Sequence, residues 1–108
     1  MTHVERNGLR LYVDDRGAGE PVLLLHGHTF DHRIWEDIVP ALVSAGRRVI
    51  APDLRGHGRS GRPDSGYAPA HHAADMLWVL DDLGVDAATV VGYSIGGGME
   101  VLVLFADR

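Results

Sequence analysis

The sequence predicts a doubly wound α/β fold with a mostly parallel sheet. Three short apolar runs, residues 22–25, 48–51 and 89–91, are continuous rather than alternating, which is typical of strands covered on both faces. Two segments with helical spacing of apolar residues, 32–45 and 69–83, separate these strands. Strands that alternate with helices pair in parallel through right-handed crossovers, so the order of the elements defines the class.

Length and composition fit one small globular domain. The chain has 108 residues, of which 45% are hydrophobic, and we treat residues 1–108 as a single partial domain. A net charge of −5 argues against nucleic acid and anionic membranes as partners. The absence of Cys excludes thiol chemistry. Because residues 1–10 are polar and no apolar run is long, we expect a cytoplasmic protein without a secretory signal or a membrane span.

The first elements are a hairpin and an interrupted helix. Asn7-Gly8 lies between two strand-like segments and best tolerates the positive φ angles of a type I′ turn, so an N-terminal β-hairpin is predicted. A Gly- and Asp-rich loop, residues 14–21, follows. In the next helical segment Asp31 is placed to cap the start, and Pro40 should kink the helix or restart it.

The remaining elements continue the alternation. A long Gly- and Arg-rich loop, residues 53–67, leads to the helix at 69–83, which Gly84 should end. That helix is expected to bury one stripe of apolar side chains, namely Ala73, Met76, Leu77, Leu80 and Leu83. Residues 95–106 are predicted as a third helix, apolar all round and therefore buried on every side.

The junction before this third helix carries the pattern G-x-S-x-G as Gly92-Tyr93-Ser94-Ile95-Gly96. A sharp bend from strand to helix strains the central residue and leaves room only for small residues two positions away on either side. Ser94 would then expose its hydroxyl at a helix N-terminus, where N–H groups stabilise negative charge. The alternative is a plain Gly-rich turn that binds phosphate, but the dinucleotide pattern G-x-G-x-x-G fails because position 94 is Ser.

Two other segments fall at the same edge of the predicted sheet. Residues 26–28 follow the first buried strand beside the Ser94 turn. The main-chain N–H of His28 is placed to join that of Ile95 in an oxyanion hole. The segment 53–60 follows the second buried strand.

With these three segments in order, the chain resembles the α/β-hydrolase superfamily over nearly its whole length. It is most similar to the branch of esterases, enol-lactonases and cofactor-free haloperoxidases. The resemblance implies that Ser94 is the nucleophile of an acyl-enzyme mechanism, that the amides of Ile95 and His28 form the oxyanion hole, and that no cofactor or metal takes part. It also implies a small-molecule substrate with an ester, lactone, thioester or amide bond, since related dehalogenases and epoxide hydrolases place Asp at this position.

The same resemblance gives the other histidines structural roles. The segment 53–60 is structural in the superfamily, so His57 is interpreted as a hydrogen-bonded loop residue. His26 is expected to turn inward and brace loops. His71 and His72 are expected to lie at the surface where a helix opens.

The acid and the base of the catalytic triad are predicted to be absent. In the superfamily an Asp or Glu and then a His follow the nucleophile on later strands. Only residues 95–108 follow Ser94, no His lies beyond His72, and Asp107 would lie about 19 Å from Ser94 along the predicted helix at 1.5 Å per residue. We therefore expect a truncated hydrolase domain that lacks its later strands, cap and last helices, and a chain that is inactive alone.

A truncated domain of this kind would have an exposed sheet edge. The strand at 89–91 should be unpaired and the predicted third helix partly uncovered. We expect marginal stability and, as partners, either a complementary C-terminal hydrolase half or a second copy of the chain.

Two other interpretations are open. In the first, the chain is a non-catalytic α/β binding module or the product of a truncated gene. In the second it is a metal-dependent hydrolase, because His26, His28, Asp31 and His32 approach the metallo-β-lactamase pattern H-x-H-x-D-H. The spacing here is one residue too long, and further ligands are not evident.

Overall fold

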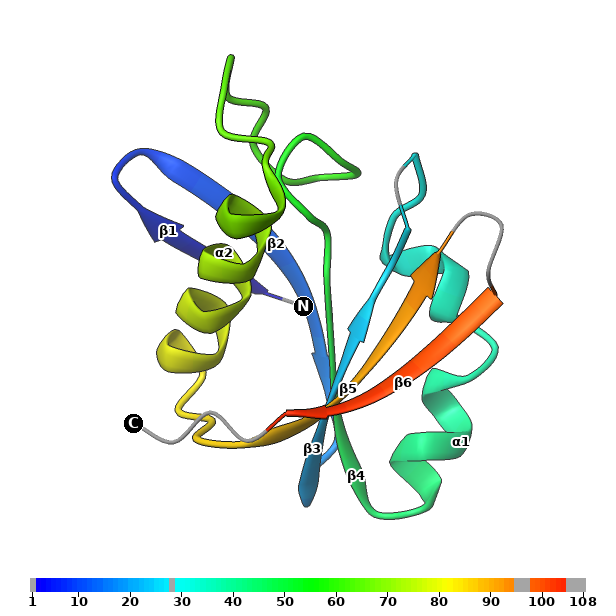
Figure 1. Ribbon diagram of the computed structural model, residues 1–108. Helices are drawn as coiled ribbons and strands as arrows, with labels where there is room; N and C mark the ends of the chain where they lie inside the picture. The colour runs from blue at the N-terminus through cyan, green and yellow to red at the C-terminus, as the bar shows by residue number, and fades with distance from the viewer. Residues whose placement is uncertain (1, 28, 95–97, 105–108) are drawn as a thin grey trace.

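The computed structural model describes residues 2–27, 29–94 and 98–104, which form one mixed sheet with helices on both faces (Figure 1). The spatial order of the strands is β1-β2-β4-β3-β5-β6. Their bounds are β1 Thr2–Arg6, β2 Leu9–Arg16, β3 Glu20–Leu25, β4 Arg47–Pro52, β5 Ala88–Ser94 and β6 Gly98–Leu104. Helix α2 (Pro69–Asp82) covers one face, and the 3-10 helix η1 (His32–Trp35) with α1 (Val39–Ser44) covers the other.

The centre of the sheet is parallel, as the sequence predicts. Strand β3 pairs in parallel with β4 on one side and with β5 on the other, so that Val22 lies opposite both Val49 and Thr89. The connection from β3 to β4 passes through η1 and α1, and the connection from β4 to β5 passes through α2. The doubly wound class is therefore confirmed.

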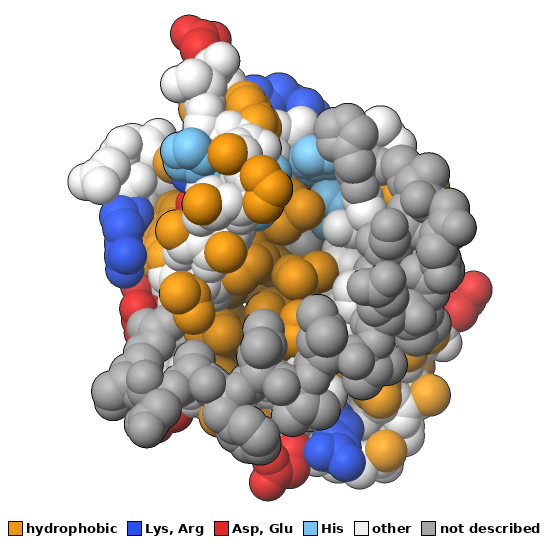
Figure 2. Space-filling model, in the orientation of Figure 1, with side chains coloured by type: hydrophobic (Ala, Val, Ile, Leu, Met, Phe, Trp, Pro, Cys, Tyr) orange, Lys and Arg blue, Asp and Glu red, His pale blue; other side chains and the backbone are white. Residues whose placement is uncertain are grey.

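Successive residues of the central strands pack into two separate cores, which is why their apolar runs are continuous. Leu23 and Ile50 belong to the cluster beneath α2, whereas Val22 and Val49 belong to the cluster beneath η1 and α1. Trp35 of η1, only 2% exposed, fills the second cluster. Hydrophobic side chains gather between α2 and the middle of the sheet in Figure 2.

The predicted hairpin turn, the predicted helix cap and the predicted effect of Pro40 are confirmed. Asn7 and Gly8 both have positive φ, 53° and 81°, as a type I′ hairpin between β1 and β2 requires. The side chain of Asp31 accepts a hydrogen bond from the main-chain N–H of Arg33 and caps η1. Pro40 lies in the first turn of α1, where its missing N–H costs no helical hydrogen bond, and the helix restarts there.

The buried face of α2 differs in part from the predicted stripe. Met76 and Leu80 are buried as expected, but Leu77 is 47% exposed and Ala73 is also exposed. The buried set instead comprises Asp75, Met76, Trp78, Val79 and Leu80. Trp78 belongs to the hydrophobic cluster between α2 and the sheet, while its ring lies 5.4 Å from the Arg6 guanidinium and its Nε1 donates to Asp82. In the described part of the chain, no helix combines the length and hydropathy that a membrane crossing requires.

The predicted helix at residues 95–106 is wrong, because Gly98–Leu104 forms strand β6 and pairs antiparallel with β5. An apolar run of this length does not by itself distinguish a buried helix from a buried strand. Glycine at positions 96–98 disfavours a helix by roughly 1 kcal/mol each relative to Ala. A second strand also satisfies the N–H and C=O groups along the outer edge of β5.

The antiparallel pairing also changes the expectation of an exposed sheet edge. The strand at 89–91 is not an unpaired edge, since Val91 and Val101 are partners across β5 and β6. The chain runs back along β5 until Leu104 lies opposite Ala88, roughly 20 Å from Ser94 at about 3.3 Å per residue. Self-association stays a prediction, now with β6 as the outer edge.

The register of β5 and β6 predicts which engineered cysteine pair can form a disulfide. Thr89 and Val103 are Cα partners, so T89C/V103C should oxidise to a disulfide in the otherwise cysteine-free chain. The control pair T89C/L102C is one residue out of register and should keep its thiols. Thiol titration and intact mass under mild oxidation measure both. Equal oxidation of the two pairs, or none in the first, would contradict the hairpin.

Candidate active site

The carboxyl end of β5 lies beside the loop that follows β3. Leu25, the last residue of β3, pairs in parallel with Gly92, and β5 then continues to its end at Ser94. The loop that begins at His26 therefore leaves the sheet at the edge where Ser94 ends its strand. The sequence predicts the nucleophile and the oxyanion loop at this edge.

The described residues include only one of the three predicted catalytic residues. Ser94 closes β5, and its Cα partner on β6 is Gly98. His28 and Ile95, whose amides are predicted to hold the oxyanion, lie outside the described residues, as does Asp107. Since β6 replaces the predicted helix, stabilisation of negative charge by a helix dipole beside Ser94 does not apply to this structure.

The His26 side chain joins the loop after β3 to the loop after β4, as predicted. It is 3% exposed, and its Nε2 accepts a hydrogen bond of 2.9 Å from the main-chain N–H of Leu54. The ring proton must then be on Nδ1, which lies 2.8 Å from the carbonyl oxygen of Gly27 and donates to it. Burial lowers the pKa of His26, consistent with a neutral ring in which both nitrogens are committed.

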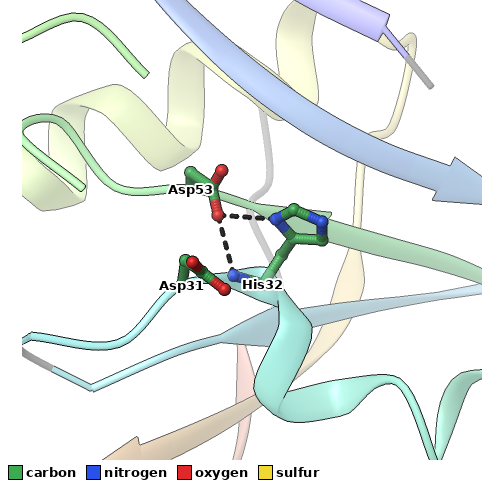
Figure 3. A group of neighbouring side chains, drawn as sticks. All are labelled: Asp31, His32 and Asp53. Carbon is green, nitrogen blue, oxygen red and sulfur yellow. Dashed lines mark hydrogen bonds and ion pairs between the residues drawn. The ribbon is translucent and has the colours of Figure 1, made fainter. Parts of the chain in front are cut away.

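The carboxylate of Asp53 organises the same two loops and is fully buried. Its Oδ1 accepts from both the main-chain N–H and the Nδ1 of His32, at 2.7 and 2.8 Å (Figure 3). Its Oδ2 accepts from the main-chain N–H of Arg59 at 3.0 Å. One side chain therefore ties the start of η1 to the loop after β4.

Two small residues of the segment 53–60 are required by this arrangement. Gly58 has a φ of 51°, and a Cβ there would lie 2.3 Å from a carboxylate oxygen of Asp53, so only glycine fits. The hydroxyl of Ser60 donates to the carbonyl oxygen of Asp53 at 2.5 Å and accepts from the main-chain N–H of Tyr12 at 2.9 Å. The segment is therefore a packed structural loop, as the resemblance implies.

The Asp53–His32 interaction is absent from the sequence prediction. The two residues are 21 positions apart and belong to different loops, so no local pattern joins them. The available signal was an acidic residue directly after a buried strand, a position where a buried carboxylate needs donors.

Asp31, His32 and Asp53 offer atoms within 4.8 Å of one another, a spacing that a metal ion could span. Their hydrogen bonds favour a different interpretation. Asp53 Oδ1 already accepts two hydrogen bonds, and His32 Nδ1 points at it. Both oxygens of Asp31 accept from Arg33, which lowers the pKa of Asp31 to about 2. His26 of the proposed metal pattern has both ring nitrogens bonded to the main chain. The cluster is a hydrogen-bonded network.

The other histidines follow the prediction in part. His57 is half-buried, its Nδ1 lies 2.9 Å from the carbonyl oxygen of Arg55, and its ring centroid lies 5.0 Å from that of His26. His71 is exposed, as expected. His72 is half-buried rather than at the surface, and burial lowers its pKa.

Comparison with known proteins gives matches over most of the chain. A family model described as alpha/beta hydrolase fold matches residues 20–106. The chain is 40% identical over 95 residues to an epoxide hydrolase of Caballeronia sordidicola, covering 86% of this chain and 29% of the relative. It is 39% identical over 92 residues to a non-heme haloperoxidase of Rhodococcus erythropolis, covering 85% of this chain and 34% of the relative.

Solved structures agree with this result. An esterase (EaEST) from Exiguobacterium antarcticum superposes with a TM-score of 0.78 at 36% identity, over 84% of this chain and 34% of the esterase. Est816, described as an N-acyl homoserine lactone degrading enzyme, gives a TM-score of 0.83 at 43% identity, over 89% of this chain and 37% of Est816. The chain thus spans about a third of the length of the relatives it matches.

Replacing Asp53 should destabilise the fold far more than replacing its neighbour Asp31. D53A leaves the buried donors of His32 and the part-buried N–H of Arg59 without an acceptor, and should cost about 3 kcal/mol or more. D31A removes a cap and an exposed ion pair, and should cost about 1 kcal/mol. Urea unfolding at neutral pH measures both. A loss for D53A no greater than that for D31A would show that Asp53 is not the organising residue.

The lowered pKa of His26 predicts a loss of stability on acidification. The unfolded chain takes up a proton on His26 near pH 6.5, whereas the folded chain does so only at lower pH. The free energy of unfolding is therefore at its full value above pH 6.5 and falls as the pH drops below it. Urea unfolding at pH 7.5 and 5.5 should give a smaller decrease in H26Q than in the parent chain. The matched variant H3Q, at an exposed position on β1, should keep the parent decrease.

Proposed function

The chain belongs to the α/β-hydrolase fold family, and on this premise we propose that it supplies the nucleophile-bearing part of a serine hydrolase. The proposed substrate is a small molecule with an ester, lactone or related acyl bond. The position of Ser94 carries the proposal, because it is the central residue of G-x-S-x-G and closes β5 beside the loop that follows β3.

In the proposed reaction Ser94 forms an acyl-enzyme. Its Oγ attacks the substrate carbonyl carbon while a base takes the hydroxyl proton, and the resulting oxyanion is held by the N–H groups of His28 and Ile95. The C–O bond to the leaving alcohol then breaks, and the alcohol takes the proton from the base. Water attacks the acyl group by the same steps in reverse, which releases the acid and restores Ser94.

The residue type at position 94 supports acyl transfer over epoxide opening. Epoxide hydrolases of this superfamily use an Asp at the corresponding position, because a carboxylate that opens an epoxide leaves an ester that water can cleave. A serine that opened an epoxide would leave an ether, which water does not cleave under mild conditions. The presence of Ser94 therefore favours the chemistry for which the esterase and Est816 are named.

We further propose that this chain alone does not turn over substrate. Two observations support this: the chain spans about a third of the length of the relatives it matches, and β6 stands where the family motif calls for a helix. The remaining acid and base would come from a complementary C-terminal hydrolase half. The same strand β6 favours the second candidate function, a non-catalytic binding module.

A chimera tests the proposed nucleophile. This chain should replace the matched third of the Rhodococcus erythropolis haloperoxidase, so that the rest of that protein supplies the later strands. A fluorophosphonate probe should then label Ser94 about a thousandfold faster than in the isolated chain, because an assembled base activates the hydroxyl. Intact-mass and peptide analysis locate the label.

Two variants control the chimera experiment. S94A should abolish labelling, while S44A, at an exposed serine at the end of α1, should leave it unchanged. A chimera that unfolds cooperatively yet is not labelled at Ser94 would contradict the catalytic proposal and favour the binding module.

A further inference from the structure

A groove of about 630 Å³ opens between the loop after β3 and the loop after β4. These neighbouring strands send their connections to opposite faces of the sheet, β3 to η1 and α1, and β4 to α2 (Figure 1). Open α/β sheets bind ligands in the crevice at such a point, beyond the carboxyl ends of the strands. Thr29, which lines the groove, directly follows His28, so the groove adjoins the proposed oxyanion loop.

Two partly exposed aromatic rings line this groove. Phe30 is 39% exposed and Tyr67 is 43% exposed. The Tyr67 ring is held in place, because its hydroxyl donates to the carbonyl oxygen of Pro63 and a Cβ at Gly56 would lie 2.6 Å from the ring. A fixed ring that keeps much of its surface open offers a flat contact for a planar group at little entropic cost.

The groove also holds Arg62, a cation that differs from its neighbour Arg33 in its partners. Arg33, at its wall, is paired with Asp31 through both carboxylate oxygens. Arg62 instead donates to the carbonyl oxygens of Gly56 and Gly58, and within the described residues it makes no ion pair. Those two hydrogen bonds hold the guanidinium against the loop and leave further N–H donors for an anion.

We infer that this groove is a subsite for a planar group with a negative charge, and that an aromatic carboxylate is its ligand class. Arg62 binds the carboxylate, and the rings of Tyr67 and Phe30 contact the aromatic part. The inference rests on the proposed function in that it takes this aromatic carboxylate to be a part of the substrate that stays ionised and lies apart from the acyl bond that Ser94 cleaves.

Titration of the isolated chain with benzoate, followed by NMR, tests the subsite. We expect a dissociation constant of about millimolar and shift changes centred on Phe30, His57, Arg62 and Tyr67. Benzamide, a neutral compound of the same shape, and acetate, an anion without a ring, should each bind about fivefold or more weakly. Equal binding of benzoate and benzamide, or shift changes elsewhere, would overturn the inference.

A pair of matched variants separates a specific contact from general charge. R62Q and R47Q remove the same charge from exposed positions, but Arg47 begins β4 at the opposite edge of the sheet. R62Q should weaken benzoate binding about fivefold and R47Q should leave it unchanged. Equal weakening by the two variants would contradict a role for Arg62.

The benzoate titration and the labelling of the chimera give separate results. Benzoate binding by the parent chain without labelling of Ser94 in the chimera would refute the proposed function alone. Labelling of Ser94 without benzoate binding would refute the subsite alone.

Discussion

The buried carboxylate of Asp53 is the constraint on which the rest of the carboxyl edge depends. A carboxylate removed from water must be satisfied by donors, and those available come from the first turn of η1 and from its own loop. The main-chain N–H of Asp53 also donates to Tyr12 of β2. Because these bonds must form together, the loops after β3 and β4 take one relative position. That position determines the shape of the groove between the two loops, and it places the main-chain N–H of Leu54 within hydrogen-bond distance of His26.

The features that could be predicted from the sequence are those decided by local chemistry. A type I′ turn needs two residues that tolerate positive φ, and Asn7-Gly8 provides them within two positions. The cap at Asp31 and the restart at Pro40 are likewise settled within one helical turn. Continuous apolar runs revealed the buried parallel strands because burial on both faces leaves no polar alternation. The Asp53–His32 bond escaped prediction because it depends on which two loops the finished sheet brings together.

The local sequence of residues 98–104 does not determine whether the segment forms a helix or a strand. Their apolar side chains meet the needs of a helix buried on every side as well as those of a buried strand, so the choice depends on what cover is available. Without β6, the N–H and C=O groups along the outer edge of β5 would lack partners among the described residues. Pairing of residues 98–104 with β5 satisfies the main-chain groups of both strands, and this favours a strand over a helix. The element that follows Ser94 is thus determined by tertiary surroundings rather than by its own sequence.

Two histidines at the carboxyl edge, His26 and His32, cannot replace the base that the proposed reaction needs. In His26 one ring nitrogen accepts from Leu54 and the other donates to Gly27, and burial lowers its pKa, so a proton taken from a serine would displace an existing bond. His32 is turned by its Nδ1 onto Asp53. Both rings fix loops in place, which preserves the shape of the edge but removes them from proton transfer. The proposed reaction therefore needs a base other than these two histidines.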